Sequence, residues 1–220
     1  MGSHMLSLLK KEKIIAIVRG VSQSSIFPIA DALCSGGIKF LEITMDTEGA
    51  LFSISQLREK YENQLYVGAG TVLDIEAAKE AIQAGAQYII SPNLNEQVVS
   101  YCVERGIDVW PGTMTPTEMY RAYQLGASAV KVFPIGTLGS NYIKEVKSPL
   151  SFIEMIATGG VNKENILPIL TNGAAAVGLG GNLVDKQLIQ QKNYSELTKR
   201  AQTFVKLAKG VGNDEAVQSY

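Results

Sequence analysis

Histidine is almost missing from this sequence. The single histidine, His4, lies in the stretch Met1-Gly2-Ser3-His4-Met5, which has the form of an expression-vector remnant, so we expect the native chain to start near Met5. Without that histidine, a Ser-His-Asp triad, a histidine metal site and a histidine general base are excluded. Proton transfer in any reaction must then fall to glutamate, aspartate, lysine, tyrosine or water.

Cysteine and long apolar runs are scarce as well. Cys34 and Cys102 are the only cysteines, and their separation fits no metal-binding spacing, so we expect two thiols in a reducing compartment. No apolar run approaches the length of a membrane span, and residues 6–11 are too short and too charged for a signal peptide. We therefore expect a cytoplasmic protein that has no membrane partner.

An excess of either charge is also absent. The 220 residues include 20 Lys and Arg against 21 Asp and Glu, a formal net charge of -1. A chain without a basic surface argues against nucleic acid as a partner. The length and the apolar share of 46% suit one globular domain with a substantial core. Any anionic ligand must therefore be bound by local geometry.

Strand-like and helix-like segments alternate along the chain. The expected strands are residues 13–18, 40–44, 65–68, 88–90, 108–110, 129–133, 152–157 and 174–179. The expected helices are residues 22–34, 47–60, 74–84, 95–105, 115–126, 141–147, 162–170 and 194–209, and residues 136–140 are expected to be a loop.

This alternation predicts a parallel sheet with right-handed crossovers. Eight such units in a chain of this length predict a single-domain α/β protein, a (β/α)8 TIM barrel over residues 6–220 after the remnant at 1–5. The alternative is a doubly wound open sheet. We favour the barrel because the glycine-rich turns come late, and no G-x-G-x-x-G follows the first strand.

One lysine interrupts the apolar strand at residues 129–133. Side chains alternate along a strand, so Ala129, Lys131 and Phe133 share one face. Desolvation in a packed interior lowers the pKa of an ammonium group and favours the neutral amine that a Schiff-base nucleophile requires. The alternative is a lysine that reaches water or pairs with a carboxylate.

Glu42 lies in the expected second strand and shares its inward face with Phe40 and Thr44. Active sites of barrels lie at the carboxyl ends of the strands, where Glu42, Lys131 and Thr71 are expected to meet. A buried glutamate beside Lys131 has two interpretations. It is either a structural ion pair or the acid/base partner of a lysine that forms an imine with a carbonyl substrate.

Two Gly-Gly pairs, Gly159-Gly160 and Gly180-Gly181, follow the expected seventh and eighth strands. Barrel loops at these positions commonly hold a phosphate, because glycine lets backbone N–H groups approach the anion. The alternative is that both pairs are ordinary strand-to-helix turns. We expect a phosphate or another anion to bind there.

Seven motifs in order and at this spacing resemble the family of 2-keto-3-deoxy-6-phosphogluconate (KDPG) and 4-hydroxy-2-oxoglutarate (KHG) aldolases. The resemblance covers nearly the whole chain from Ile14 onward. The motifs are IVRG (17–20), LEIT (41–44), GAGTVL (68–73), ISPN (90–93), KVFP (131–134), TGGV (158–161) and GLGG (178–181).

The resemblance implies a metal-independent, class I aldolase that cleaves a 2-keto-4-hydroxy acid to pyruvate and an aldehyde. The aldehyde is glyceraldehyde 3-phosphate from KDPG or glyoxylate from KHG. The family pattern makes Lys131 the Schiff-base lysine and Glu42 the proton shuttle. It also implies a homotrimer that requires no metal or cofactor, so we expect chelators to leave its activity unchanged. The substrate-binding residues that it implies are Arg19, Thr71, Pro92, Phe133 and Thr158, and the phosphate-binding residues are Gly159, Gly160, Gly180, Gly181 and Asn182.

Two positions depart from the family pattern. Many members have an arginine where this chain has Asp46, and that arginine helps to bind the pyruvyl carboxylate. Many also have a serine where this chain has Asn182. We expect Arg19 to supply the missing positive charge. An Arg-Gly pair after the first strand also occurs in 2-keto-3-deoxy-6-phosphogalactonate aldolases, which makes that activity an alternative.

Two other kinds of function remain open from the sequence. A sugar-phosphate isomerase or decarboxylase barrel would use the same phosphate loops without an imine. A non-catalytic phosphate-binding barrel would keep Lys131 and Glu42 as a structural pair, because one barrel fold supports many functions.

Overall fold

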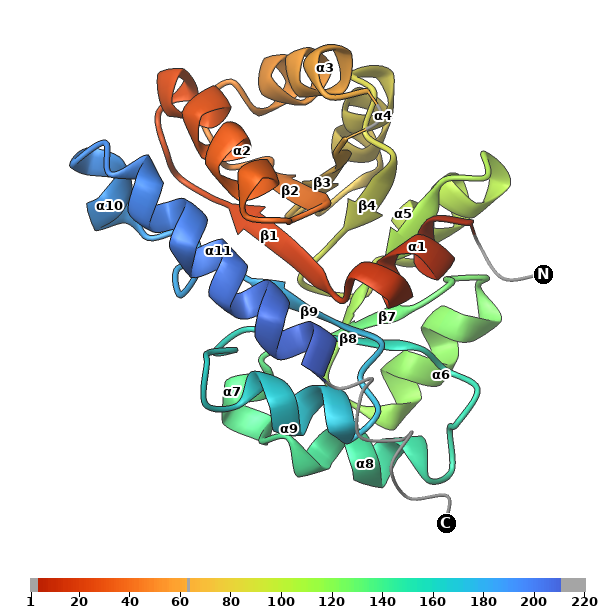
Figure 1. Ribbon diagram of the computed structural model, residues 1–220. Coiled ribbons are helices and arrows are strands. Elements are labelled where there is room, and N and C mark those ends of the chain that lie inside the picture. The colour runs from red at the N-terminus through yellow and green to blue at the C-terminus, as the bar shows by residue number, and fades with distance from the viewer. Residues whose placement is uncertain (1–3, 63, 211–220) are drawn as a thin grey trace.

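The computed structural model describes residues 4–62 and 64–210 and consists of a parallel sheet surrounded by helices (Figure 1). Residues 1–3, which belong to the expected remnant, and residues 211–220 lie outside the described part. The strands are β1 (Ile14–Val18), β2 (Phe40–Thr44), β3 (Tyr66–Gly70), β4 (Tyr88–Ile90), β5 (Asp108–Trp110), β6 (Gly112–Thr113), β7 (Val130–Val132), β8 (Met155–Thr158) and β9 (Ala176–Leu179).

Helices follow most strands, and the long C-terminal helix packs on the outside of the barrel against α2 and α9 (Figure 1). The α-helices are α1 (His4–Glu12), α2 (Ile26–Ser35), α3 (Ala50–Lys60), α4 (Ile75–Gln83), α5 (Glu96–Glu104), α6 (Pro116–Gln124), α7 (Ile135–Leu138), α8 (Asn141–Lys147), α9 (Ile166–Thr171), α10 (Lys186–Gln190) and α11 (Tyr194–Lys209). A short 3-10 helix, η1 (Gln23–Ser25), precedes α2. None of the helices in the described residues has the length and apolar character that crossing a bilayer requires.

The sheet closes through a strand that is split in two. Its order is β5-β4-β3-β2-β1-β9-β8-β7-β6, so the two edge segments are consecutive in the chain and are separated only by Pro111. A proline has no N–H to donate to a ladder. Its carbonyl still accepts a hydrogen bond of 2.8 Å from the backbone N–H of Lys131. Taken together, β5 and β6 form the fifth of eight barrel strands, and the expected (β/α)8 barrel is confirmed.

The barrel interior is filled by side chains that alternate with those facing the helices. Phe40, Tyr88 and Trp110 pack ring against ring, with centroid separations of 5.8 Å for Phe40–Tyr88 and 4.7 Å for Tyr88–Trp110. Leu6 and Leu9 from α1 belong to the same buried cluster. Because only Lys13 separates α1 from β1, this helix covers the end of the barrel where the strands begin. The opposite end of the barrel, where the strands end, is therefore available for an active site.

Some local expectations were wrong. The seventh strand was expected over residues 152–157, but β8 begins at Met155 and Phe152 lies exposed in a turn. In this turn the N–H of Ile153 bonds to the carbonyl of Leu150, so the preceding backbone pairs locally instead of with the sheet. Residues 136–140 were expected to be a loop, but α7 occupies much of that stretch. Neither α1 nor α10 was expected.

Candidate active site

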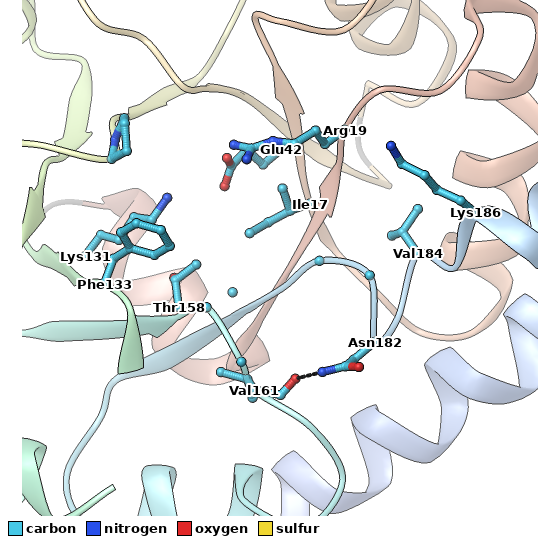
Figure 2. A pocket seen from close by; sticks show the side chains of 16 residues that line it. Ile17, Arg19, Glu42, Lys131, Phe133, Thr158, Val161, Asn182, Val184 and Lys186 are labelled. Carbon is cyan, nitrogen blue, oxygen red and sulfur yellow. Dashed lines mark hydrogen bonds between the residues drawn. The ribbon is translucent and has the colours of Figure 1, made fainter. Parts of the chain in front are cut away.

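A cavity of about 370 Å³ opens where the strands end (Figure 2). Residues from several strands and from the loops that follow them form its walls. Eleven of the twelve residues proposed from the sequence line it: Arg19, Glu42, Pro92, Lys131, Phe133, Thr158, Gly159, Gly160, Gly180, Gly181 and Asn182. Thr71 is the twelfth; it does not line the cavity but accepts a hydrogen bond from the side chain of Arg19.

Lys131 is the central residue of β7 and is only 5% exposed. Its side chain points inward, with the Nζ atom 5.2 Å from the centre of the Phe133 ring. Burial lowers the pKa of Lys131, and the positive charge of Arg19 lowers it further, while the Glu42 carboxylate acts in the opposite direction. The net effect favours the neutral amine at a pH where an exposed lysine is charged.

Glu42 comes from β2 and is 1% exposed. Figure 2 shows its carboxylate and the Nζ atom of Lys131 pointing into the same pocket. Burial raises the pKa of Glu42 above its ordinary value of 4.5, against the lowering effect of the charges of Lys131 and Arg19. The nearby Asp46 raises that pKa further. A raised pKa favours the protonated form, which a carboxyl group requires to act as a general acid.

The Glu42 carboxylate fits only because Gly70, on the neighbouring strand β3, has no side chain. A Cβ atom placed on Gly70 would lie 1.8 Å from Glu42 Oε1. That oxygen is buried and has no hydrogen-bond partner among the described residues, so it is not locked into a bond with Lys131. The geometry therefore does not support the simple structural ion pair that the sequence left open.

Arg19 follows β1 and has two polar neighbours at the rim. Its Nη2 atom donates a hydrogen bond of 2.6 Å to Thr71 Oγ1, and its Nε atom lies 3.8 Å from Asp46 Oδ2. Asp46 does not line the cavity, so its carboxylate is directed at Arg19 and not at the ligand space. Because Arg19 and Asp46 are both half-exposed, their ion pair contributes only about 0–1 kcal/mol. Arg19 is therefore free to turn toward an anionic ligand at little cost.

The backbone conformation at the first Gly-Gly pair requires glycine. Gly159 and Gly160 have φ values of 86° and 81°, a region that side-chain-bearing residues rarely adopt. A Cβ atom on Gly160 would lie 2.9 Å from the Cα atom of Gly136, whose N–H bonds to the carbonyl of Gly159. In the second pair, a Cβ atom on Gly180 or Gly181 would meet nothing within 4 Å. The second pair therefore lines open space that a ligand can fill.

Asn182 joins the two glycine loops. Its side-chain amide donates a hydrogen bond of 2.7 Å to the carbonyl of Val161, drawn as a dashed line in Figure 2. One of its two N–H groups is therefore engaged within the protein. The sequence proposal gave Asn182 a direct role in anion binding, and the structure adds a second role, which is to hold the loops together.

Sequence reasoning missed Lys186, the first residue of α10. Its side chain lines the cavity on the side where Arg19 lies (Figure 2). The sequence held one weak signal for this helix, the capping residue Asp185. Its side chain accepts a hydrogen bond of 2.7 Å from the N–H of Gln187. A helix of only five residues has too short an apolar pattern to be predicted. Four apolar or glycine positions were also missed: Ile17, Val161, Gly178 and Val184.

Comparison with known families decides the assignment. The family model described as KDPG and KHG aldolase matches residues 5–200. This chain belongs to the KDPG and KHG aldolase family. It is thus an aldolase, a carbon–carbon lyase, and the isomerase, decarboxylase and non-catalytic alternatives are not supported.

Individual relatives in this family agree with the assignment. The 2-dehydro-3-deoxy-phosphogluconate aldolase of Treponema pallidum is 32% identical over 200 residues, covering 90% of this chain and 95% of that protein. The 2-dehydro-3-deoxy-6-phosphogalactonate aldolase of Escherichia coli is 35% identical over 174 residues, covering 79% of this chain and 85% of that protein. The relatives thus include both sugar-acid activities.

A solved structure provides a chemical parallel. The KDPG aldolase from Legionella pneumophila was crystallised with pyruvate captured as a covalent carbinolamine. It superimposes with a TM-score of 0.84 at 25% identity, covering 91% of this chain and 97% of that one. A carbinolamine is the adduct that precedes a Schiff base, as expected for an aldolase of this class.

Proposed function

We propose that Lys131 is the Schiff-base lysine of this aldolase and that the substrate is KDPG, cleaved to pyruvate and glyceraldehyde 3-phosphate. One observation carries the proposal. A buried amine with a lowered pKa and a buried carboxylate with a raised pKa face the same cavity at the end of the barrel. Titratable groups whose pKa values are displaced in this way mark acid/base and nucleophilic roles.

The first half of the reaction builds the imine. The neutral amine of Lys131 attacks the C2 carbonyl carbon of the substrate and forms a carbinolamine. Glu42 in its protonated form donates a proton to the departing hydroxyl group, and water leaves as the C=N bond forms. The raised pKa of Glu42 favours the protonated form that this step requires.

The second half breaks the carbon–carbon bond. Glu42, now a carboxylate, accepts the proton of the C4 hydroxyl group. The C3–C4 electron pair moves into the protonated imine, giving an enamine and releasing the aldehyde. Protonation of C3 and hydrolysis of the imine then release pyruvate and regenerate Lys131, so atoms and protons balance over the cycle.

The rest of the cavity suits a substrate with an anion at each end. Arg19, oriented by Thr71, supplies the cation for the pyruvyl carboxylate. The glycine loops supply backbone N–H groups for the phosphate at the other end. Pro92, Phe133 and Thr158 also line the cavity, where they hold the carbon chain.

The second candidate substrate is 2-keto-3-deoxy-6-phosphogalactonate, which differs from KDPG in its configuration at C4. Two observations favour it. Arg19 is the cation beside Thr71, whereas position 46 carries an aspartate. The Escherichia coli relative named for that activity is 35% identical to this chain.

A pyruvate-release assay on three substrates tests the proposed function. We expect at least one of the two phosphorylated sugar acids to be cleaved with a higher kcat/KM than KHG, because only they occupy the glycine loops. Absence of pyruvate from all three substrates would contradict the proposal. A comparison of the two epimers decides which sugar acid is the substrate.

Lys186 gives a prediction about phosphate binding. Its exposed ammonium group adds positive charge to the cavity, so Lys186→Met should raise KM about 5- to 20-fold for the phosphorylated substrate. The kcat should change little, because Lys186 is not placed at the reacting carbons. Steady-state kinetics on KDPG and KHG provide the measurement.

Two matched variants control this prediction. Lys186→Arg keeps the charge and should keep most of the affinity. Lys199→Ala removes a lysine on α11 whose side chain is 72% exposed and does not line the cavity, and it should leave KM unchanged. An equal rise in KM for KHG, which has no phosphate, would show that Lys186 does not act on the phosphate.

We further propose that residues 6–220 are one native domain that works in the cytoplasm as a homotrimer. Cys34 and Cys102 are free thiols, which suits a reducing compartment. Tyr120, Tyr123 and Phe152 form an exposed aromatic cluster, with Tyr123 and Phe152 ring centroids 4.9 Å apart, as expected of a surface that packs against another chain. Light scattering should give the mass of three 23.7 kDa chains, and a monomer or dimer mass would contradict the trimer.

A further inference from the structure

The barrel interior beneath the active site contains two buried polar side-chain atoms without hydrogen-bond partners. Glu42 Oε1 and the hydroxyl of Tyr88 both lack a hydrogen-bond partner among the described residues, and Tyr88 is fully buried. More than nine in ten buried polar groups in proteins are satisfied, so each exception requires an explanation. The proposed mechanism uses Glu42, but it gives Tyr88 no role.

The strand register brings these two residues together. Glu42 on β2 lies opposite Gly68 on β3, and the pairing of Ala69 with Ile89 places Tyr88 on β4 beside that same glycine. The three residues therefore form one row across adjacent strands, with β2 and β4 about 10 Å apart. No side chain lies between Glu42 and Tyr88 in this row.

The Tyr88 ring occupies the space above Gly68. A Cβ atom on Gly68 would lie 2.2 Å from Cε2 and 2.5 Å from Cζ of this ring, so the tyrosine extends across β3 toward β2. Gly70, the next inward position on β3, makes the matching room for the Glu42 carboxylate. Because these two glycines of β3 have no side chains, none of its side chains separates the Tyr88 hydroxyl from the Glu42 carboxylate.

We infer that the Tyr88 hydroxyl donates a hydrogen bond to the Glu42 carboxylate across one water, and that Tyr88 is a positioning residue of the aldolase. This inference rests on the proposed role of Glu42 in proton transfer. A phenol donates one proton and a carboxylate only accepts, so the pair is complementary. The bond stabilises the ionised form of Glu42 and holds it toward the substrate.

The electrostatic surroundings of Glu42 are consistent with a need for such a donor. Burial and Asp46 favour the protonated carboxyl group, whereas Lys131 from β7 and Arg19 from the loop after β1 favour the carboxylate. When Lys131 becomes an imine, its electrostatic effect on Glu42 changes, whereas the Tyr88 hydroxyl remains available as a hydrogen-bond donor. Burial raises the pKa of Tyr88 well above 10, and the charge of Glu42 raises it further, so this residue remains a neutral donor.

The test is the pH dependence of kcat for Tyr88→Phe, which keeps the ring and removes only the hydroxyl. Loss of a hydrogen bond to a charged group should move the acidic limb of the profile upward by about one pH unit. Below both midpoints the variant is then about tenfold slower than the parent enzyme, and on the plateau the two are similar. Tyr66→Phe removes another hydroxyl from the same aromatic cluster and should leave the limb in place.

The outcomes separate the inference from the function on which it rests. An unshifted limb, or a uniform loss of kcat at every pH, shows that Tyr88 only fills space and overturns the inference. Borohydride trapping of pyruvate is measured on the parent enzyme and on Tyr88→Phe in parallel. Failure to trap pyruvate on the parent enzyme overturns the proposed function and the inference with it. A normal adduct with an unshifted limb overturns the inference alone.

Discussion

Replacing Lys131 with alanine is expected to abolish both turnover and covalent capture of pyruvate. The amine is the only group in the mechanism that bonds to the substrate, so kcat/KM should fall by about 10⁴-fold or more. In the parent enzyme, borohydride reduces the imine and fixes pyruvate on the peptide that contains Lys131. Mass spectrometry of the digested protein provides the measurement.

Two variants control this experiment. Lys186→Ala removes the other lysine that lines the cavity and should still give the adduct, because its nitrogen is not the nucleophile. Lys131→Arg keeps a long basic side chain in β7 but cannot form the imine, since an arginine side chain stays protonated. An adduct that survives in Lys131→Ala, or a parent enzyme that gives none, would refute the assignment of the nucleophile.

Exchanging Glu42 for glutamine is expected to remove most of the turnover and leave the fold intact. Glutamine has nearly the shape of glutamate but cannot shuttle a proton, and general acid–base catalysis typically contributes 10²- to 10⁴-fold. We expect kcat to fall within about that range. Single-turnover kinetics should show slower imine formation as well as slower bond cleavage, because Glu42 acts in both steps.

The same variant has a predicted effect on stability. The folded-state pKa of Glu42 lies above its ordinary value of 4.5, so the folded protein binds a proton more tightly than the unfolded chain. Stability then falls as pH rises through the interval above 4.5, because burying the carboxylate costs free energy. Thermal unfolding should therefore show Glu42→Gln at least as stable as the parent at pH 7, with the difference vanishing below pH 4.5.

A clear loss of stability at pH 7 in Glu42→Gln would contradict this reasoning. It would show that the carboxylate is held by contacts that outweigh its burial. A kcat close to that of the parent enzyme would instead remove Glu42 from the mechanism, whatever happened to stability. The two measurements test the two roles of the residue separately.

Local patterns in the sequence were enough to predict the architecture and most of the proposed residues that line the cavity. Apolar runs that alternate with amphipathic segments reflect the two- and 3.6-residue periods of strands and helices, which are properties of short stretches. Lys131 and Glu42 were recognisable because each is a charged residue inside such a run. The glycine pairs were recognisable because they follow expected strands, where barrel sites lie.

Features that depend on contacts between residues far apart in the sequence became visible only in the folded structure. The sequence does not show that Pro111 divides a strand, or that α1 covers the base of the barrel, because both depend on closure of the whole sheet. Lys186 reaches the cavity from a helix too short to predict, and Asp46 turns to Arg19 instead of to the ligand.

The pairing of Tyr88 with Glu42 shows the physical reason most clearly. The sequence predicts that each of the two residues lies in a strand, because strand character follows from the neighbouring residues in the chain. Their proximity depends on the register of three strands and on two glycines that leave room for the Tyr88 ring and the Glu42 carboxylate. Periodicity is local, whereas register and the filling of space are set only when the barrel closes.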